Sequence, residues 1–428
     1  MSDHMIKNFS TLATTQLRID GLSILEAGYK SILTKDVVQS QVRRKGDILS
    51  LRDHNIDLTN FARVFFVAIG KCAVSASEVI EPLLADRLTS GIVLDVCDGD
   101  FSKLKCCVGT HPFPSEANIV ATESIQDLLK DLTDKDLVIL VISGGGSALL
   151  CSPLELRVED LTRVNKYFFE QGATIEELNT VRKHLSTVQG GQLAKQMYPA
   201  MVYSLIFSDV PGNDLSLVAS GPTVLDQTTK ADALAIIDKY GGYKLSGLRE
   251  TSIGETPKEE KYFANVNNIL FLTNEQALEA MKKRALELGY SCVICDSSVQ
   301  AEATQLGQIL SKLPILSNSC WLYGGETTVA VRGNGRGGRC QELVLSALPN
   351  LIADYLLIAA SSDGWDNSPV AGAVGDKELF ERAKNEHLDI EDYLARNDSY
   401  SFFQQCGGFI DTGRTGANVS DFYLVLKK

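Results

Sequence analysis

A short run of small residues in the first half of the chain has the composition of an anion-binding turn. It follows an apolar stretch, 136–142, that predicts a parallel strand buried on both faces. Where such a strand turns into a helix, backbone N–H groups lack partners at the positive end of the helix dipole, and glycines let a phosphate or carboxylate approach them. The alternative is a tight turn that only packs the helix on the strand. The run consists of Ser143, Gly144, Gly145, Gly146 and Ser147.

Three cationic side chains stand beside glycines and could bind an anion. Lys71 follows Gly70 at a predicted strand-to-helix turn, where the helix dipole assists anion binding. Arg339 follows Gly338 and could hold a carboxylate or a phosphate with both arms of its guanidinium group. Arg336, in the same glycine-rich segment, is a second candidate for this role.

Acidic side chains follow several predicted strands. Asp209, Asp363 and Asp366 lie at such positions and could bind Mg²⁺ directly or through water. Aspartates at strand ends also cap helices, so both interpretations stay open for each of the three. Glu326 follows two glycines at a strand end, where it could bind the ribose of a nucleotide or pair with Arg339.

Three consecutive basic residues end a predicted helix. A basic group at this point would suit the carboxylate of a small acid, and a solvated run of charge is the alternative. The residues are Arg182, Lys183 and His184.

Composition and charge exclude two classes of partner. The chain has 428 residues and a net charge of −13, whereas a nucleic-acid-binding protein needs a basic face. No apolar run reaches the roughly 20 residues of a membrane-spanning helix, and the first residues lack the apolar segment of a signal peptide. Ten scattered cysteines are typical of reduced thiols. The sequence therefore predicts a cytoplasmic protein that binds neither nucleic acid nor membranes.

Apolar segments of strand length alternate with segments of helical periodicity along most of the chain. This order predicts a parallel or mostly parallel sheet with helices on both faces. A polar, charged stretch near residue 250 separates two such blocks. We therefore expect an α/β protein of two domains, 1–241 and 263–428, joined by a linker at 242–262.

Polar groups follow almost every predicted strand, and in open α/β sheets functional residues collect at the carboxyl ends of the strands. In combination and in order, these segments resemble the class II glycerate kinases, a family whose C-terminal part is called the MOFRL domain. The resemblance extends over nearly the whole chain. The matching segments are 69–71, 111–114, 142–150, 179–184, 208–212, 219–223, 324–327, 337–342 and 415–418.

The resemblance implies a fold and an activity. The first domain would have a Rossmann-like parallel sheet with helices on both faces, and the second would be a MOFRL-type α/β domain. The family transfers the γ-phosphate of ATP to D-glycerate, and most characterised members give 2-phospho-D-glycerate. ATP and Mg²⁺ are therefore the expected cofactors, glycerate is the expected small-molecule substrate, and a monomer or homodimer is expected.

The same resemblance assigns roles to the candidate residues. Lys71, Arg339 and Asp209 would be catalytic, because phosphoryl transfer requires charge to be positioned around the moving group. Metal binding would fall to Asp209, Asp363 and Asp366. Substrate or phosphate would be bound by residues 143–147 together with Arg182, Lys183, Glu326 and Arg336.

Four positions depart from the family pattern. Ser115 stands where the family usually has Asp after His-Pro-x-Pro, and Asn213 replaces another Asp. Val370 stands in place of a carboxylate in the run that begins at Asp363, and Arg414 adds a charge where the family usually has proline. These changes bear on substrate detail more than on the class of reaction.

Two other functions are alternatives. An NAD(P)H-dependent hydroxypyruvate reductase would need a Gly-x-Gly-x-x-Gly turn between strand and helix, and neither 142–148 nor the single glycine at 70 provides it. A non-catalytic regulatory protein that binds an anionic ligand is the second alternative, because lost carboxylates could leave binding intact.

Overall fold

The chain forms two compact units that do not follow the order of the sequence. The computed structural model describes residues 4–245 and 248–428. One unit comprises Thr34–Ser208 and Asn213–Phe271, and we call it the parallel-sheet unit. The other, the mixed-sheet unit, comprises the chain up to Leu33, Asp209–Gly212 and Leu272–Lys428.

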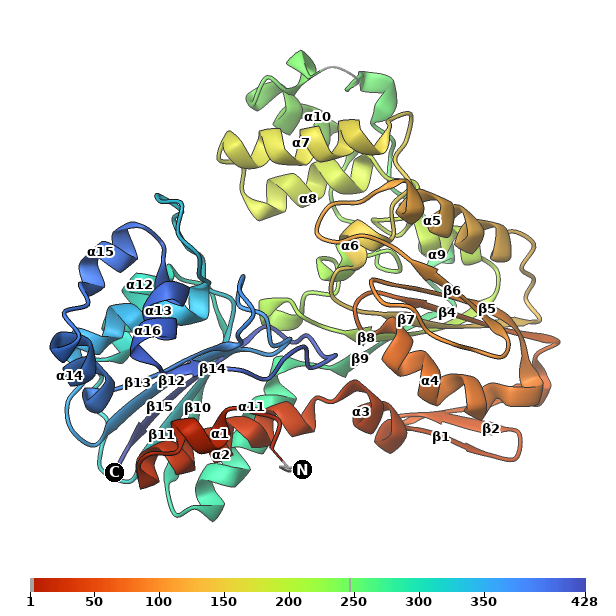
Figure 1. Ribbon diagram of the computed structural model, residues 1–428. Helices are drawn as coiled ribbons and strands as arrows, with labels where there is room; N and C mark the ends of the chain where they lie inside the picture. The colour runs from red at the N-terminus through yellow and green to blue at the C-terminus, as the bar shows by residue number, and fades with distance from the viewer. Residues whose placement is uncertain (1–3, 246–247) are drawn as a thin grey trace. The chain divides into compact units, whose positions relative to one another are not determined.

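A six-stranded sheet forms the core of the parallel-sheet unit (Figure 1), and parallel pairing joins the strands from β6 to β8. Its central strand β7 is buried at every residue, as its continuous apolar sequence predicts. In sheet order the strands are β6 (Leu104–Val108), β5 (Leu88–Asp95), β4 (Arg63–Ile69), β7 (Asp136–Ile142), β8 (Met201–Phe207) and β9 (Val266–Leu272).

Helices cover both faces of this sheet, which confirms the predicted Rossmann-like arrangement (Figure 1). One face is covered by α4 (Ala73–Leu84). The opposite face carries α5 (Glu116–Leu128), α6 (Gly146–Leu149) and α9 (Gln192–Met197). Before the large sheet the chain forms α3 (Thr34–Gln41) and a separate antiparallel sheet of β1 (Val42–Lys45), β2 (Ile48–Leu51) and β3 (His54–Asp57).

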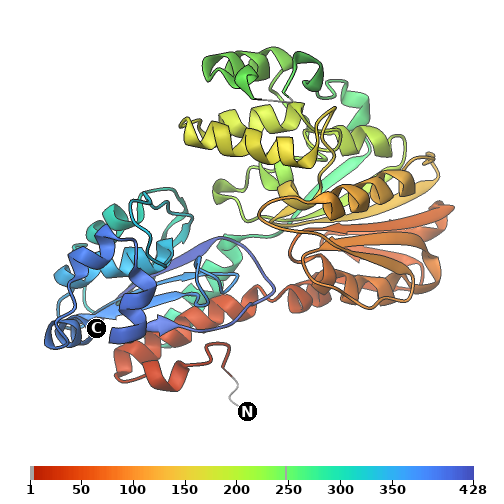
Figure 2. The same cartoon turned by 45° about the horizontal axis from the view of Figure 1, so that its top comes forward.

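Three further helices of the parallel-sheet unit pack on one another (Figure 2). They bury an apolar cluster of their own, to which Val164, Phe168, Val181 and Ile237 belong. The cluster is separate from the core under the sheet, so these helices pack as a group of their own beside the carboxyl ends of the strands. They are α7 (Val158–Glu170), α8 (Ile175–His184) and α10 (Lys230–Lys239).

The mixed-sheet unit also has a six-stranded sheet, in which only β10 and β11 are parallel and the other pairs are antiparallel. One face packs on α2 (Gln16–Ser31) and α11 (Asn274–Glu287), with α1 (Phe9–Leu12) beside them. The sheet order is β10 (Ser291–Val299), β11 (Ser319–Gly325), β15 (Asp421–Lys427), β12 (Tyr355–Ser361), β13 (Gly372–Asp376) and β14 (Phe409–Ile410). The other face carries α12 (Ala303–Leu310), α13 (Arg339–Ala347), α14 (Lys377–Asn385), α15 (Ile390–Ala395) and α16 (Ser399–Cys406).

The observed units differ from the predicted domains 1–241 and 263–428. Helix α2 packs on α11 and on strands β12 and β15, so the start of the chain belongs to the mixed-sheet unit. The predicted linker 242–262 is part of the parallel-sheet unit, where the N–H of Gly254 donates to the oxygen of His184 at 2.8 Å; residues 246 and 247 of that segment lie outside the described residues.

No helix within residues 4–245 and 248–428 is long and apolar enough to cross a membrane. Helix α2 has 16 residues, fewer than the roughly 20 that a span needs.

A buried ion pair fixes the N-terminal helix α2 to the mixed sheet. Arg18 is 2% exposed and donates from Nε and Nη2 to the two carboxylate oxygens of Asp376, at 2.6 and 2.8 Å. Asp376 also accepts the N–H of Leu379 at the start of α14. Burial lowers the pKa of Arg18, but the hydrogen bonds and charge of Asp376 outweigh burial and raise it above its usual value.

Helix α13 begins under the cap of a second buried carboxylate. Asp366 is 3% exposed, and its oxygens accept the N–H groups of Cys340 and Gln341 at 3.1 and 2.9 Å. The side-chain amide of Gln341 donates to it as well, at 2.8 Å. Burial, with a further contribution from the charge of Asp421, raises the pKa of Asp366 to about 6.

The variant Arg18→Ala should lower the free energy of unfolding of the mixed-sheet unit by about 3–5 kcal/mol, because it leaves the Asp376 carboxylate without its counter-charge. The two tryptophans of the chain, Trp321 and Trp365, both lie in this unit. Tryptophan fluorescence in urea therefore follows its unfolding.

The matched control for that experiment is Lys377→Ala, which removes an exposed pair with Glu381 and should leave the urea midpoint unchanged. Equal midpoints for the two variants would contradict a stabilising role of Arg18.

The raised pKa of Asp366 predicts a pH dependence of the same unfolding transition. The native state binds this proton more tightly than the unfolded chain, whose aspartates have pKa values near 4. The contribution of Asp366 to the free energy of unfolding should therefore fall by about 3 kcal/mol as pH rises from about 4 to about 6. Urea unfolding of the wild type and Asp366→Asn across this range should show a difference that changes with pH. A constant difference would contradict the prediction.

Candidate functional site

The parallel-sheet unit contains a pocket with a volume of about 270 Å³. One wall comes from the loops after β6 and β7 and includes His111, Gly145 and Ser147. Another comes from α7 and the end of α8 and includes Asn165 and Arg182. The pocket lies at carboxyl ends of parallel strands, where α/β sheets bind ligands. It brings together three residues that the sequence singles out, two from the glycine turn and one from the basic helix end.

Within the glycine turn, Gly145 is the position whose backbone requires glycine and that borders the pocket. Its φ of +84° lies in the left-handed region. A Cβ atom there would lie 3.2 Å from Cδ2 of His111 and 3.2 Å from Cγ of Lys71. The N–H of Lys71 donates to the oxygen of Gly144 at 2.9 Å. Lys71 is therefore a neighbour of the turn beside the pocket.

Other residues of the turn make packing contacts. Ser143 is buried, and its hydroxyl group bonds to main-chain atoms at the end of β4. A Cβ atom on Gly146 would lie 2.5 Å from Cβ of Ala219, and Oγ of Ser147 lies 3.0 Å from Oγ of Ser220. Helix α6 has only four residues, so its dipole is small. Packing contacts are therefore present at Ser143, Gly146 and Ser147, and anion binding stays a prediction for the part of the run that lines the pocket.

The three basic residues at the end of α8 lie in different environments: one lines the pocket, and the other two are buried in contacts with the protein. Nζ of Lys183 lies 3.3 Å from Oδ1 of Asp226, and both side chains are buried. His184 is also buried, with Nδ1 2.8 Å from the carbonyl oxygen of Thr180. A solvated charge run is therefore wrong for Lys183 and His184. Arg182 is half-buried and lines the pocket.

In the mixed-sheet unit, Arg339 is held by two carboxylates. Its Nε and Nη2 donate to Oδ2 and Oδ1 of Asp421 at 2.6 and 3.0 Å, and its Nη1 donates to Oε1 of Glu326 at 2.5 Å. Burial lowers the pKa of Arg339, but the charge and hydrogen bonds of Asp421 raise it well above its usual value. Pairing with Arg339, one of the two predicted roles of Glu326, is present in the structure.

The glycine-rich segment before Arg339 packs on a neighbouring loop. Cβ atoms added at Gly333, Gly335 and Gly337 would lie 2.3, 2.5 and 2.1 Å from atoms of segment 396–399. These glycines are therefore required by close packing. The guanidinium group of Arg336 stacks 4.9 Å from the centre of an aromatic ring on α16.

Asp209 and Asp363 both form hydrogen bonds with the same loop, residues 415–420. Oδ2 of Asp209 accepts from the side-chain amide of Asn418 at 3.0 Å, and its main-chain oxygen accepts from Oγ of Ser420 at 2.5 Å. The N–H of Thr415 donates to the oxygen of Asp363 at 3.3 Å. Both aspartates are half-buried.

Asp366, the third predicted metal ligand, uses both carboxylate oxygens to cap α13. No group of three or more His, Cys, Asp or Glu side chains that could hold a metal ion occurs in the described part of the chain. A complete cage of protein ligands is therefore absent there.

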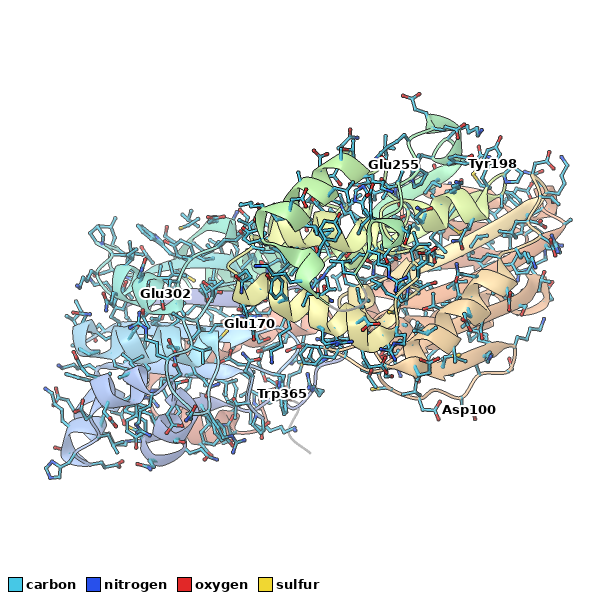
Figure 3. All side chains as sticks on the ribbon, turned by 90° about the horizontal axis from the view of Figure 1, so that it is seen from above. Asp100, Glu170, Tyr198, Glu255, Glu302 and Trp365 are labelled. Carbon is cyan, nitrogen blue, oxygen red and sulfur yellow. The ribbon has the colours of Figure 1, made fainter. Side chains whose placement is uncertain are left out.

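At the end of β12, Arg414 stacks on Trp365. Its Cζ lies 4.3 Å from the ring centre, and its Nη1 lies 3.7 Å from Oδ2 of Asp363. Trp365, labelled in Figure 3, is 41% exposed. This departure from the family pattern adds a positive charge beside a predicted metal ligand.

The other departures have local structural roles. Ser115 begins α5 with a capping box that includes Asn118. Asn213 has a φ of +58°, which asparagine adopts more readily than most residues. Val370 is buried, and its main-chain oxygen accepts the N–H of Asp366 at 2.9 Å.

Sequence reasoning missed two residues of these sites. Asp421 directly precedes an apolar run, 422–426, that could have indicated a strand, but nothing local names Arg339 as its partner. Asn165 lies mid-helix in α7 without a motif, and its contact with Arg182 comes from the packing of α7 on α8.

Two family models match the chain. One, described as a domain of unknown function, DUF4147, matches residues 20–248. The other, the MOFRL family, matches residues 319–421.

Relatives match over nearly the whole length. The D-glycerate 2-kinase of Thermotoga maritima is 34% identical over 86% of this chain and 91% of its own. A putative hydroxypyruvate reductase of Agrobacterium vitis is also 34% identical, over 95% and 98%. The crystal structure of the Thermotoga maritima glycerate kinase superposes with a TM-score of 0.84 at 31% identity, covering 96% of this chain and 99% of that one. The chain belongs to the MOFRL-family glycerate kinases.

Proposed function

We propose that this protein transfers the γ-phosphate of ATP to D-glycerate and forms 2-phospho-D-glycerate. The support is the family, together with relatives named D-glycerate 2-kinase and glycerate 2-kinase at 33–34% identity. The observation that carries the proposal is the pocket of the parallel-sheet unit. There a half-buried arginine, Arg182, lines the same cavity as Gly145, and Lys71 lies beside that glycine.

Charge and shape of this pocket suit a small acid with hydroxyl groups. Arg182 offers a planar cation for the carboxylate. Lys71, at the glycine turn, offers a second cation for the phosphoryl group that is transferred. The main-chain contacts of Ser143 and the packing of Gly146 hold the turn that borders Lys71, and Nε of Arg182 is held by Asn165.

Mg²⁺ would bind together with ATP, held by carboxylates of this chain and by the phosphates of the nucleotide. Proteins usually hold Mg²⁺ through one or two carboxylates together with substrate phosphates. Asp209 and Asp363 are two carboxylates on one loop cluster, and they would hold the ion, whereas Asp366 caps a helix. Bound Mg²⁺ would neutralise charge on the nucleotide phosphates.

Arg339 keeps a catalytic role in the proposal. Three of its five N–H groups are used by Asp421 and Glu326, which fix the guanidinium plane. The other two would be available to an anionic group of a substrate.

The test is to incubate the protein with D-glycerate, ATP and Mg²⁺ and to identify the product. Enolase consumes 2-phosphoglycerate directly, so formation of phosphoenolpyruvate without a mutase is the expected result. Phosphoenolpyruvate that forms only when a mutase is added would show the 3-phospho product. NADH oxidation with hydroxypyruvate, without kinase activity, would overturn the proposal in favour of a reductase.

Gly145→Val should abolish glycerate binding while the fold is kept, because the added side chain enters the space beside Lys71 and His111. Isothermal titration with glycerate and circular dichroism would measure the two effects. Gly172→Val is the matched control, because Gly172 has a similar φ of +78° with nothing within 4 Å of its added Cβ. Both variants carry a backbone strain of about 1–2 kcal/mol. Equal loss of affinity in both would attribute the effect to strain.

Arg339→Lys should lower kcat by roughly two to three orders of magnitude and change KM for glycerate much less, because lysine keeps the charge but loses the planar fork. Steady-state kinetics would measure this, with tryptophan fluorescence as the check on folding. Arg332→Lys, an exposed arginine in the same segment, should leave kcat unchanged. A raised KM with preserved kcat would instead assign Arg339 to binding of the acid.

A further inference from the structure

Arg182 is a charged group without a charged partner. Its Nε donates to Oδ1 of Asn165 at 2.8 Å. Within the described residues, no Asp or Glu forms an ion pair with Arg182, and none lines the pocket. Burial lowers the pKa of the Arg182 guanidinium, with no opposing contribution from a neighbouring acid. A half-buried guanidinium group that has no acidic side chain beside it is stabilised by an anion that enters the pocket.

Arg182 is the one guanidinium or ammonium group among the residues that line the pocket, and Lys71 lies outside this lining, beside Gly145. Apart from Arg182, the lining residues of the pocket include no lysine or arginine. Leu161 and Leu185 are apolar, and Gln189 donates its amide to the main-chain oxygens of Ser147 and Leu150. Lys183 is bound to Asp226 instead.

A single guanidinium group in the lining of a pocket matches a carboxylate better than a polyphosphate. A carboxylate has two oxygens in one plane and binds a guanidinium group through two parallel hydrogen bonds. A nucleotide triphosphate carries several charges and needs several cations or a metal ion around it.

We propose that Arg182, oriented by Asn165, binds the carboxylate of the acceptor acid, so that Asn165 determines specificity for carboxylates over neutral polyols and amides. This inference rests on the proposed function. Asn165 acts as a positioning residue because it contacts Nε and leaves both Nη groups for the ligand. An amide at this position orients the arginine without cancelling its charge.

The decisive variant is Asn165→Asp, which keeps the shape and the Nε contact but gives Arg182 an internal counter-charge. KM for glycerate should rise about 10- to 100-fold, the range for a lost charge-assisted contact. The kcat and the KM for ATP should stay within about twofold of wild type. Lys166→Gln, at the next position of α7, makes the same change of one charge unit on an exposed side chain and should leave KM for glycerate unchanged.

Two further measurements distinguish the effect of the new charge on glycerate binding from a change in the structure of the pocket. Glyceramide, the neutral amide of glycerate, should be a poor acceptor for the wild type and equally poor for Asn165→Asp, because it has no charge to lose. Isothermal titration of glycerate without nucleotide should show the same loss of affinity as the kinetics. Arg182→Gln should bring the KM for glycerate close to that for glyceramide.

Several results would overturn the inference while leaving the kinase activity intact. An unchanged KM for glycerate in Asn165→Asp is one. A rise in KM for ATP alone in Arg182→Gln is another, because it would assign the pocket to the nucleotide. Failure of the wild type to phosphorylate glycerate would defeat the proposed function, but titration with glycerate would still test the carboxylate contact.

Discussion

The buried carboxylate of Asp421 fixes the polar centre of the mixed-sheet unit. It stands at the start of β15, between β11 and β12, and is 0% exposed. A carboxylate at this depth requires a counter-charge, and the two-armed contact of Arg339 provides it. That contact sets where α13 begins, and its first turn then donates to Asp366. Because Asp366 is buried near a second negative charge, its pKa is raised. The ion pair, the start of α13 and the buried carboxylate that caps it therefore lie next to one another, and the charge of Asp421 adds to the effect of burial on the pKa of Asp366.

In the parallel-sheet unit, Arg182 differs from Arg339 because its partner is a neutral amide and not a carboxylate. Both arginines are half-buried, but Arg339 is paired with two carboxylates and Arg182 contacts one neutral amide. The first arrangement is complete without a ligand, and it positions a guanidinium group rigidly. The second is completed by an anion, so its free energy favours binding. The two arginines are suited to different tasks, the first to stabilising charge that develops during a reaction and the second to selecting an acid.

The sequence predicted strand 136–142 with the bounds that the structure has, because it is a continuous apolar run that ends at a serine and three glycines. It did not predict that α2 joins the mixed sheet, since a helical pattern does not specify the surface that buries it. In the candidate site, the grouping of Gly145 with Arg182 followed from a family motif. The burial of Lys183 on Asp226 could not be predicted, because the two residues are 43 positions apart and nothing in the sequence between them indicates the contact.

Glycine content alone does not distinguish the two glycine-rich segments of this chain. Added Cβ atoms at Gly146 and at all four glycines of segment 333–338 would meet other atoms closer than 3 Å, which marks packing. Gly145 differs because its added Cβ would meet only the side chains of His111 and Lys71, at 3.2 Å, beside a pocket. Gly145 also has a positive φ, so its backbone requires glycine as well, and its place beside the pocket is what distinguishes it from the packed glycines. The difference lies in what surrounds each glycine, so it becomes visible only once the chain is folded.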